Sequence, residues 1–320
     1  METLRPTTEA RRDLIEELVH AIRGQLLERG ESPPSSWIEE STDDLVKGRT
    51  KGWYLTGPNA ETSGLGFYSI RPRAAFGHVH VEPGPGAVRR ATRLLDAIRK
   101  DLPSEVESLD AGFTGLDPTE ERELSRALNH PPRQTMLERR ALERTIVPED
   151  AAPIRGAPKG VRLYPIRTIP RDALVELDFR AFYGTIDAQL IGSDRKEYAR
   201  MMDELIEGRM GRFLDEASTA VVDATTGELE GALLTSEQSP RLAVYLDVMV
   251  EPSHRRKGLG RYLVRWGFRA LSALGYPAVR LWVTSENEPA RALYRSTGFH
   301  EVSSATIYRE TRDPGQPHPG

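Results

Sequence analysis

The stretch from Leu242 to Gly260 places an apolar run, a basic turn with two glycines and an amphipathic segment in direct succession. The run Leu242–Val250 is rich in β-branched and aromatic residues and predicts a strand, which ends before Pro252. After the turn, apolar residues recur at helical spacing, at Leu263, Val264, Trp266, Phe268, Leu271 and Leu274. The predicted order is therefore strand, glycine-containing turn, helix.

This turn has the features of an anion-binding site. Gly258 and Gly260 let the main chain approach a ligand without a Cβ in the way, and the following helix offers unpaired N–H groups and the positive end of its dipole. Positive side chains gather at the same place, namely Arg255, Arg256, Lys257 and Arg261. We expect a pyrophosphate to bind here; the alternative is a solvated basic cluster that caps a helix.

A second unit of the same kind follows. Pro277–Val283 predicts a strand, Thr284–Glu288 a polar turn and Pro289–Ser296 a short helix with a proline in its first turn. Gly298 then ends the helix, as glycine commonly does after a helical C-terminus. Further upstream, Arg171–Phe182 and Glu197–Met210 also predict helices.

Together, Arg255-x-x-Gly258-x-Gly260 and the later series Val283, Asn287, Ala290, Leu293, Tyr294, Gly298 and Phe299 resemble the GNAT superfamily of acyl-CoA-dependent N-acyltransferases. The resemblance implies an α/β fold with a mixed, mainly antiparallel twisted sheet flanked by helices, and acetyl-CoA as co-substrate. It implies that the strand pairs with the pantetheine arm, that the turn binds the pyrophosphate, that Asn287 contacts the arm and that Tyr294 faces the thioester sulfur. The implied CoA-binding residues are Val248, Met249, Val250, Arg255, Arg256, Lys257, Gly258, Leu259, Gly260, Arg261, Asn287 and Tyr294.

The implied chemistry is direct attack of a primary amine on a thioester through a tetrahedral oxyanion. Main-chain N–H groups near Val248 and Val250 would stabilise that charge. The leaving thiolate benefits from a proton donor, and the hydroxyl of Tyr294 is the candidate general acid. The alternative for Tyr294 is a core tyrosine on an amphipathic helix.

Asp247 is the candidate general base, because it is a charge inside an otherwise apolar run. Alternation along the strand would place Tyr245, Asp247 and Met249 on one face and Val248 and Val250 on the other. Pairing of Asp247 with an arginine is the alternative.

Four residues are candidate contacts of the acceptor. The resemblance puts the segment from Phe179 to Asp187 beside the acceptor, which nominates Tyr183 and Asp187; an aromatic helix packed on the sheet is the alternative. Glu237 and Glu286 are carboxylates close to the inferred cleft.

The first half of the chain repeats the second in one register. His78–Gly84 parallels Asp247–Ser253, and Leu124-Ser125-Arg126 parallels Leu293-Tyr294-Arg295. The first copy has Gly84-Pro85-Gly86 in its turn, and Pro118 and Ser125 at the positions of Asn287 and Tyr294. We therefore expect two tandem GNAT-like domains, of which the first binds CoA poorly or not at all.

The expected domains are a degenerate copy over 1–146 with a structural or substrate-shaping role, a linker over 147–160 rich in Pro, Gly and Ala, a catalytic copy over 161–312 and a disordered tail over 313–320. The chain contains no cysteine, which excludes disulfides, thiolate metal sites and a cysteine acyl-enzyme, and no metal is expected. The net charge of −4 does not indicate a nucleic-acid-binding surface. Residues 1–20 lack an apolar core, so we expect neither a signal peptide nor a membrane helix, and a cytoplasmic monomer or homodimer.

The predicted function is that of an N-acetyltransferase acting on a primary amine. The two-copy layout with the active copy second also resembles the mycothiol synthases, whose acceptor is an amino-sugar thiol, and antibiotic or protein N-terminal acetylation stays open. A non-catalytic acyl-CoA-binding sensor or scaffold is the alternative of another class. The acceptor, the use of longer acyl groups, the identity of the base and the oligomeric state are left open by the sequence.

Overall fold

The computed structural model describes residues 2–28, 36–57, 61–71, 74–130, 133–154, 156, 158–192 and 194–312, apart from the side chains of Glu28 and Arg71. The chain forms two compact units: unit 1 is Met1–Arg139 with Ser303–Gly320, and unit 2 is Arg140–Val302. The predicted tail over 313–320, and residues 155 and 157 of the predicted linker, lie outside the described residues.

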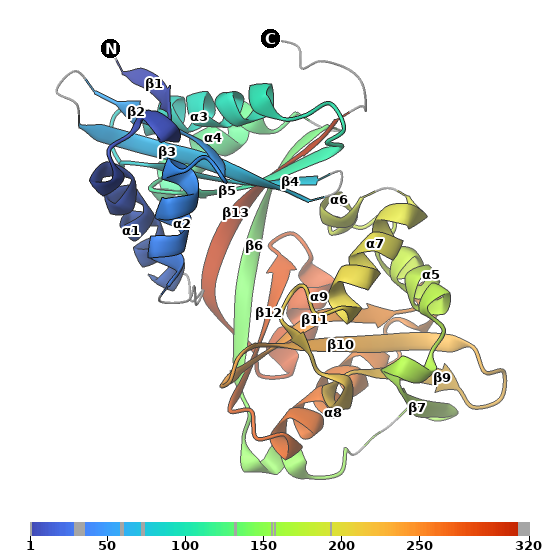
Figure 1. The fold of residues 1–320 in the computed structure, drawn as a ribbon. Coiled ribbons are helices and arrows are strands. Elements are labelled where there is room, and N and C mark those ends of the chain that lie inside the picture. The colour runs from blue at the N-terminus through green and yellow to red at the C-terminus, as the bar shows by residue number, and fades with distance from the viewer. Residues whose placement is uncertain are drawn as a thin grey trace. The chain divides into compact units, whose positions relative to one another are not determined.

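Unit 1 is a sheet with helices on both faces (Figure 1). Its elements are β1 (Thr3–Pro6), η1 (Thr7–Glu9), α1 (Arg12–Glu28), α2 (Trp37–Val46), β2 (Lys51–Thr56), β3 (Thr62–Arg71), β4 (Ala74–Val81), α3 (Ala87–Asp101), β5 (Ser108–Thr114) and α4 (Pro118–Leu128). The strand order is β1-β2-β3-β4-β5-β13, antiparallel except for the parallel pair β4–β5. Leu94 and Leu124 bring α3 and α4 to one core cluster, and Ile15 and Leu45 bring α1 and α2 to another.

Unit 2 has the same plan. Its strands lie in the order β6-β12-β11-β10-β9-β7, with β8 on β10, and β11–β12 is a parallel pair. Its elements, with the two strands β6 and β13 that also enter unit 1, are β6 (Gln134–Thr145), η2 (Pro148–Ala151), β7 (Val161–Pro165), η3 (Ile166–Thr168), α5 (Arg171–Phe182), α6 (Ala188–Ile191), α7 (Arg195–Ile206), β8 (Arg212–Phe213), η4 (Asp215–Ala217), β9 (Thr219–Asp223), β10 (Leu229–Ser239), β11 (Leu242–Val250), η5 (Pro252–His254), α8 (Leu259–Ala273), β12 (Ala278–Thr284), α9 (Glu288–Ser296) and β13 (His300–Thr311). A core cluster with α8 and α9 lies on one face of this sheet, and a cluster with α5 and α7 on the other. Of the helices that the structure describes, none has the length and apolar character needed to span a bilayer.

The expected fold is confirmed in both units, each a mixed and mainly antiparallel sheet flanked by helices. The predicted strand Leu242–Val250 and helix Arg171–Phe182 have the predicted bounds. The helix predicted over Glu197–Met210 is instead α7, Arg195–Ile206. It ends early because Gly208 takes a left-handed conformation (φ 76°).

The expected domain boundaries differ from the two compact units, because β6 and β13 each contribute to both. The second half of β13 pairs antiparallel with β5, from Ile307 opposite Gly112 to Thr311 opposite Ser108. Tyr308 of this half is fully buried in the core of unit 1. Conversely, Leu142 of β6 is buried in the core of unit 2. The strand predicted to end the second copy therefore completes the first.

The first part of the predicted linker over 147–160 is folded. Asp150 of η2 pairs with both terminal guanidinium nitrogens of Arg144, at 2.7 and 2.9 Å, and accepts a hydrogen bond from the N–H of Val147. The guanidinium of Arg144 also lies 3.9 Å from the centroid of the Phe268 ring on α8. This segment is therefore part of unit 2.

Two helical glycines give a matched test of this packing. A Cβ on Gly267 of α8 would meet the side chains of Tyr245 and Leu233, the latter at 2.7 Å, whereas a Cβ on Gly24 of α1 would meet nothing within 4 Å. We expect Gly267→Ala to lower the free energy of unfolding by about 1–3 kcal/mol through overpacking. Gly24→Ala should raise it by about 0.5–1 kcal/mol, since alanine favours a helix. Urea denaturation measures both, and effects of the same sign would contradict the packing described.

Candidate functional site

The parallel strands β11 and β12 are paired only over their first residues. The described pairs are Leu242–Ala278, Ala243–Val279 and Val244–Arg280, and none follows in the described chain. From Tyr245 to Val250, the edge of β11 on the β12 side therefore has no strand partner. Main-chain N–H and C=O groups on such an edge pair readily with another extended chain. This edge can bind a ligand that carries amide groups.

A β-bulge in β11 changes which side chains share a face. Leu234 of β10 lies opposite Asp247 and Thr235 lies opposite Tyr245, so Leu246 is an extra residue. Tyr245 points to α8, where its hydroxyl donates to the carbonyl of Val264 at 3.1 Å. The prediction that Tyr245 and Asp247 share a face is therefore wrong. Asp247 follows the bulge and lies on the α5 and α7 side with Met249, which packs in that cluster.

Two acids face each other on that side. Asp178 of α5 is 0% exposed, and burial raises the pKa of its carboxyl to about 7. Burial, followed by the charge of Asp178, raises the pKa of Asp247 well above its usual value. No basic side chain pairs with Asp247 in the described part of the chain, so the arginine partner considered from the sequence is not found.

Asp187, a predicted substrate contact, connects three elements. Its carboxylate accepts hydrogen bonds from the hydroxyl of Thr284, at the end of β12, and from the amide of Asn287 at 2.5 Å. The amide oxygen of Asn287 accepts from the N–H of Ala290 at 3.1 Å and so caps α9. Both ends of the Asn287 side chain are thus engaged within the protein, and Asp187 is 9% exposed.

Tyr294 of α9 lies on the opposite face of the diverging strands from Asp247. It is 9% exposed, makes an edge contact with Phe299 at 5.7 Å between ring centroids and belongs to the cluster that Val248 and Val250 pack against. A hydroxyl and a carboxyl group thus flank the unpaired edge of β11 from its two sides. This arrangement suits an acid and a base that act on one reacting centre.

The basic turn has its N–H groups open. Gly258, the N-cap of α8, has φ 89°, and Arg256 is also left-handed at φ 64°. The first hydrogen bond of the helix runs from Tyr262 N–H to the Gly258 carbonyl, at 3.0 Å, and the N–H groups of residues 256–261 have no acceptor in the described chain. Consecutive free N–H groups at the start of a fifteen-residue helix favour an anion.

The four cations of the turn divide into two kinds. Arg255 is tied back, with its guanidinium donating to the carbonyl of Ala181 and to that of Val250 at 3.4 Å. Arg261 donates to the hydroxyl of Ser296 at 3.2 Å. Arg256 and Lys257 are exposed. Two of the four predicted cations are therefore engaged within the protein, and the main-chain N–H groups are the stronger evidence for an anion site.

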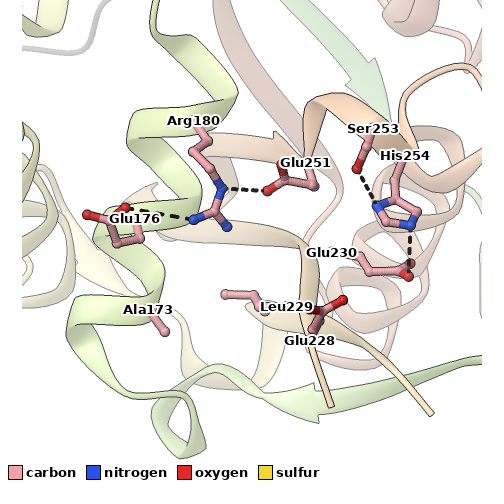
Figure 2. A pocket seen from close by; sticks show the side chains of 9 residues that line it. All are labelled: Ala173, Glu176, Arg180, Glu228, Leu229, Glu230, Glu251, Ser253 and His254. Carbon is pink, nitrogen blue, oxygen red and sulfur yellow. Dashed lines mark hydrogen bonds and ion pairs between the residues drawn. The ribbon is translucent and has the colours of Figure 1, made fainter. Parts of the chain in front are cut away.

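A pocket of about 510 Å³ lies beside the turn, between α5, the start of β10 and η5 (Figure 2). In it, Arg180 pairs with Glu251 at 2.8 Å, and His254 lies between Ser253 and Glu230, at 3.1 Å from each. Most of its charged groups are carboxylates, which repel phosphate. The pocket therefore does not replace the turn as the anion site.

The remaining predicted substrate residues lie at different places in unit 2. Glu237 lies opposite Ala243, at the far end of β11, where Arg212 and Tyr276 donate to it. Glu286 is exposed in the turn before α9. Tyr183 is 63% exposed, at the end of α5.

Sequence reasoning missed Asp178 and its neighbour Tyr198 of α7, which is fully buried. The signal for Asp178 was present. It lies four residues after Leu174 and three before Ala181, on the apolar face of α5, where a charge is out of place.

Unit 1 has the corresponding strands and turn, but its strand pair is closed. β4 and β5 are paired over seven positions, from Ala74–Ser108 to His80–Thr114. The hydroxyl of Thr114 also hydrogen-bonds the rings of His78, at 2.9 Å, and His80, at 3.0 Å. No edge of β4 is free toward β5 along this length.

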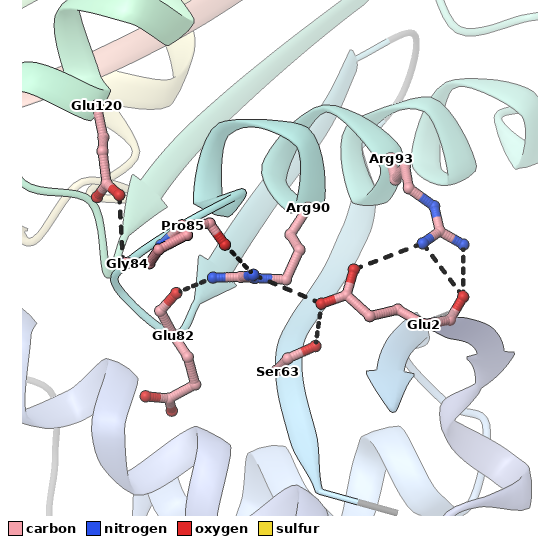
Figure 3. A network of polar contacts seen from close by, with 8 residues as sticks. All are labelled: Glu2, Ser63, Glu82, Gly84, Pro85, Arg90, Arg93 and Glu120. Carbon is pink, nitrogen blue, oxygen red and sulfur yellow. Dashed lines mark hydrogen bonds and ion pairs between the residues drawn. The ribbon is translucent and has the colours of Figure 1, made fainter. Parts of the chain in front are cut away.

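In unit 1, side chains of the protein make polar contacts at the turn and beside it (Figure 3). Gly86 is a left-handed N-cap like Gly258, with φ 86°. The N–H of Gly84 donates to Glu120 at 3.3 Å, and Arg90 donates to the carbonyl of Glu82 at 2.6 Å. The side chain of Glu2 lies against Arg90 and Arg93 in the same network. Among the described residues, no three His, Asp or Glu side chains of either unit are arranged to hold a metal ion.

Residues 173–299, which include the open turn and the diverging strands, match the model of the Acetyltransferase (GNAT) family. A mycothiol acetyltransferase of Clavibacter sepedonicus is 29% identical over 156 residues, which are 48% of each chain. The chain spans about half the length of the curated relatives it matches.

Two solved structures cover nearly the whole chain. A GCN5-related N-acetyltransferase from Sphaerobacter thermophilus has a TM-score of 0.63 at 18% identity, covering 98% of this chain and 97% of its own. A tandem GNAT protein from the clavulanic acid biosynthesis pathway has a TM-score of 0.55 at 16% identity, covering 99% and 100%. The fold is thus that of a tandem GNAT protein. Within unit 2, residues 173–299 are thus similar in sequence to GNAT acetyltransferases.

The connection made by Asp187 can be tested by its removal. Asp187→Ala leaves the buried hydroxyl of Thr284 and the amide of Asn287 without their acceptor. We expect a loss of about 1–3 kcal/mol in the free energy of unfolding, measured by urea denaturation. The control Asp203→Ala removes an exposed ion pair with Arg171 and should cost less than about 1 kcal/mol. Equal losses in the two variants would contradict the role of Asp187.

Proposed function

We propose that unit 2 transfers an acetyl group from acetyl-CoA to a primary amine. The observation that carries this proposal is the divergence of β11 and β12 directly before a helix start with open N–H groups. The family match supports acyl transfer in general. The donor, the acceptor and the residue roles below are our inference.

The donor fits the groups that the protein leaves unpaired. The pyrophosphate would be held by the N–H groups of residues 256–261, with Arg256 and Lys257 adding charge from solvent. The pantetheine amides would pair with the free edge of β11 between Tyr245 and Val250, as a neighbouring strand does. Asn287 would shape this site by fixing the start of α9 rather than by offering a free amide.

Tyr294 and Asp247 would act from opposite sides of the thioester. Asp247 removes a proton from the ammonium form of the amine, whose nitrogen then forms a bond to the thioester carbon. N–H groups of β11 stabilise the oxyanion, and the carbon–sulfur bond breaks as the Tyr294 hydroxyl gives its proton to the departing thiolate. The second proton lost by the nitrogen goes to solvent, from which Tyr294 takes up a proton again. A raised pKa suits Asp247 to this task, because a stronger base takes a proton from an ammonium group more readily.

The acceptor is proposed as a class. Lone carboxyl groups without basic neighbours favour a cationic amine. Because curated relatives are named mycothiol acetyltransferases, an amino-sugar thiol is the second candidate acceptor.

Unit 1 is proposed to bind no acyl-CoA. Its strands β4 and β5 are paired at seven positions, and Glu120 accepts a hydrogen bond from an N–H group of its turn. A ligand there would have to break strand hydrogen bonds and displace an internal carboxylate. Unit 1 would then serve a structural role.

We expect one acetyl-CoA per chain by isothermal titration calorimetry. Gly258→Ala should weaken binding at least about tenfold, because a Cβ disfavours the left-handed conformation by about 1–2 kcal/mol and shifts the N–H groups. Gly86→Ala imposes the same strain on the matching N-cap of unit 1 and should leave the affinity unchanged. Two binding sites, or a loss in Gly86→Ala alone, would refute the assignment to unit 2.

Removal of the Tyr294 hydroxyl tests the chemistry. We expect Tyr294→Phe to lower kcat by about 100-fold or more while acetyl-CoA binds as before, since proton donation to the thiolate is lost. The measurement is release of free CoA with a panel of primary amines that includes amino sugars. If the wild type bound acetyl-CoA yet released no CoA with any amine, a sensor or scaffold would be the better assignment.

A further inference from the structure

Asp178 is a fully buried acid whose carboxylate oxygens accept no hydrogen bond from an N–H or O–H donor in the described chain. The polar group beside it is the carboxyl of Asp247. Its cluster is apolar, with Leu174, Leu177, Ala181 and Met249 among the members. An unpaired acid in such a core costs stability. Residues that lower the stability of the fold and make no stabilising contact are concentrated at functional sites.

A second polar group without a hydrogen-bond partner in the described residues lies near the same two acids. Tyr198 of α7 is 0% exposed and its hydroxyl has no hydrogen-bond partner in the described residues. Phe179 holds the ring edge-on, at 5.2 Å between centroids. Burial raises the pKa of Tyr198, and the charges of Asp178 and Asp247 raise it further, so the hydroxyl stays protonated near both acids. It is thus a buried, protonated hydroxyl close to both acids.

Among the described residues, the ionisable groups that act on Asp247 and Tyr198 are acids and a tyrosine. Arg195 of α7 lies over the outer ring, that of Phe179, at 4.6 Å. Asp178 comes from α5, Asp247 from β11, Asp187 from the segment before α6, and Tyr198 and Glu197 from α7. Neighbouring acids with little exposure to water do not all ionise, which favours one proton held between two of them. The negative charge that is left attracts a cation.

We propose that Asp178 and Asp247 hold a single shared proton, that Asp247 takes the proton of an acceptor entering as a primary ammonium ion, and that Asp178 and Tyr198 are positioning residues for this step. The inference rests on the proposed acetyl transfer. One N–H bond of the ammonium breaks, and its proton goes to an oxygen of Asp247. The charge of the pair changes from minus one to zero, and the freed electron pair of the nitrogen attacks the thioester carbon.

The pair gives the enzyme a pH dependence with a definite sign. Below the pKa of Asp178, which is about 7, the pair is neutral and cannot take a proton, so activity falls as the pH falls. Stability follows the opposite trend. Because the folded state raises the pKa of Asp178, the protein loses stability as the pH rises from the unfolded-state pKa toward 7. Replacing Asp178 should therefore remove a destabilising group at pH 8.

The experiment is the pH profile of kcat/KM for a primary alkylamine, with acetyl-CoA affinity and Tm measured in parallel. We expect Asp178→Asn to lower kcat/KM at pH 8 by about 10–100-fold and to move the acid limb at least one pH unit from its wild-type position. Its acetyl-CoA affinity should not change, and its Tm should be equal or higher. Tyr198→Phe should lower kcat/KM at unchanged Tm, because its hydroxyl has no partner to lose. Asp203→Asn, in an exposed ion pair on α7, is the matched control and should leave rate and limb unchanged.

The outcomes separate this inference from the proposed function. If wild type releases no CoA with any amine, the proposed function fails and the inference fails with it. If wild type turns over and Asp178→Asn keeps its rate and acid limb, the inference alone is overturned. If Asp178→Asn lowers Tm and leaves the acid limb of the pH profile where it is in the wild type, Asp178 has only a structural role in the core. If Tyr198→Phe loses activity only because its Tm is lowered, Tyr198 likewise has only a structural role.

Discussion

The point at which β11 and β12 stop pairing determines the rest of unit 2. Two adjacent parallel strands normally satisfy each other's main-chain groups along their length. Here β12 is held by other contacts. Near its start, Arg280 donates to Glu143 of β6 at 2.6 Å, and at its end Thr284 donates to Asp187. These side-chain contacts stabilise β12 away from β11, so a strand edge stays available inside a folded sheet without being an open edge of the molecule.

The two units share one arrangement of elements, and small differences decide whether the strand edge and the turn are free to bind a ligand. Both have a strand, a left-handed glycine N-cap and a helix in the same order. In unit 1 the strands pair along their length, and Glu120 accepts a hydrogen bond from an N–H group of the turn. In unit 2 the described strand pairs stop after Val244–Arg280, and the N–H groups of residues 256–261 have no acceptor in the described chain. A shared scaffold with a difference in a few side chains is what duplication followed by divergence produces.

Local features could be predicted from the sequence and long-range ones could not. The bounds of β11 and the glycine turn follow from periodicity and from conformational preference, which act over a few residues. The side of β11 on which Asp247 lies depends on Leu246, an extra residue defined only by the register with β10. Asp178 approaches Asp247 from a helix far away in the chain, and the exchange of β13 requires the whole sheet. Alternation, applied without that register, rightly placed Asp247 with Met249 and wrongly placed it with Tyr245.

The exchange of strands also bears on how the protein is made. During synthesis from the N-terminus, the edge of β5 stays unpaired until residues 307–311 have left the ribosome, after all of unit 2. An unpaired strand edge can associate with other chains. The first unit to be synthesised is therefore the last to be completed.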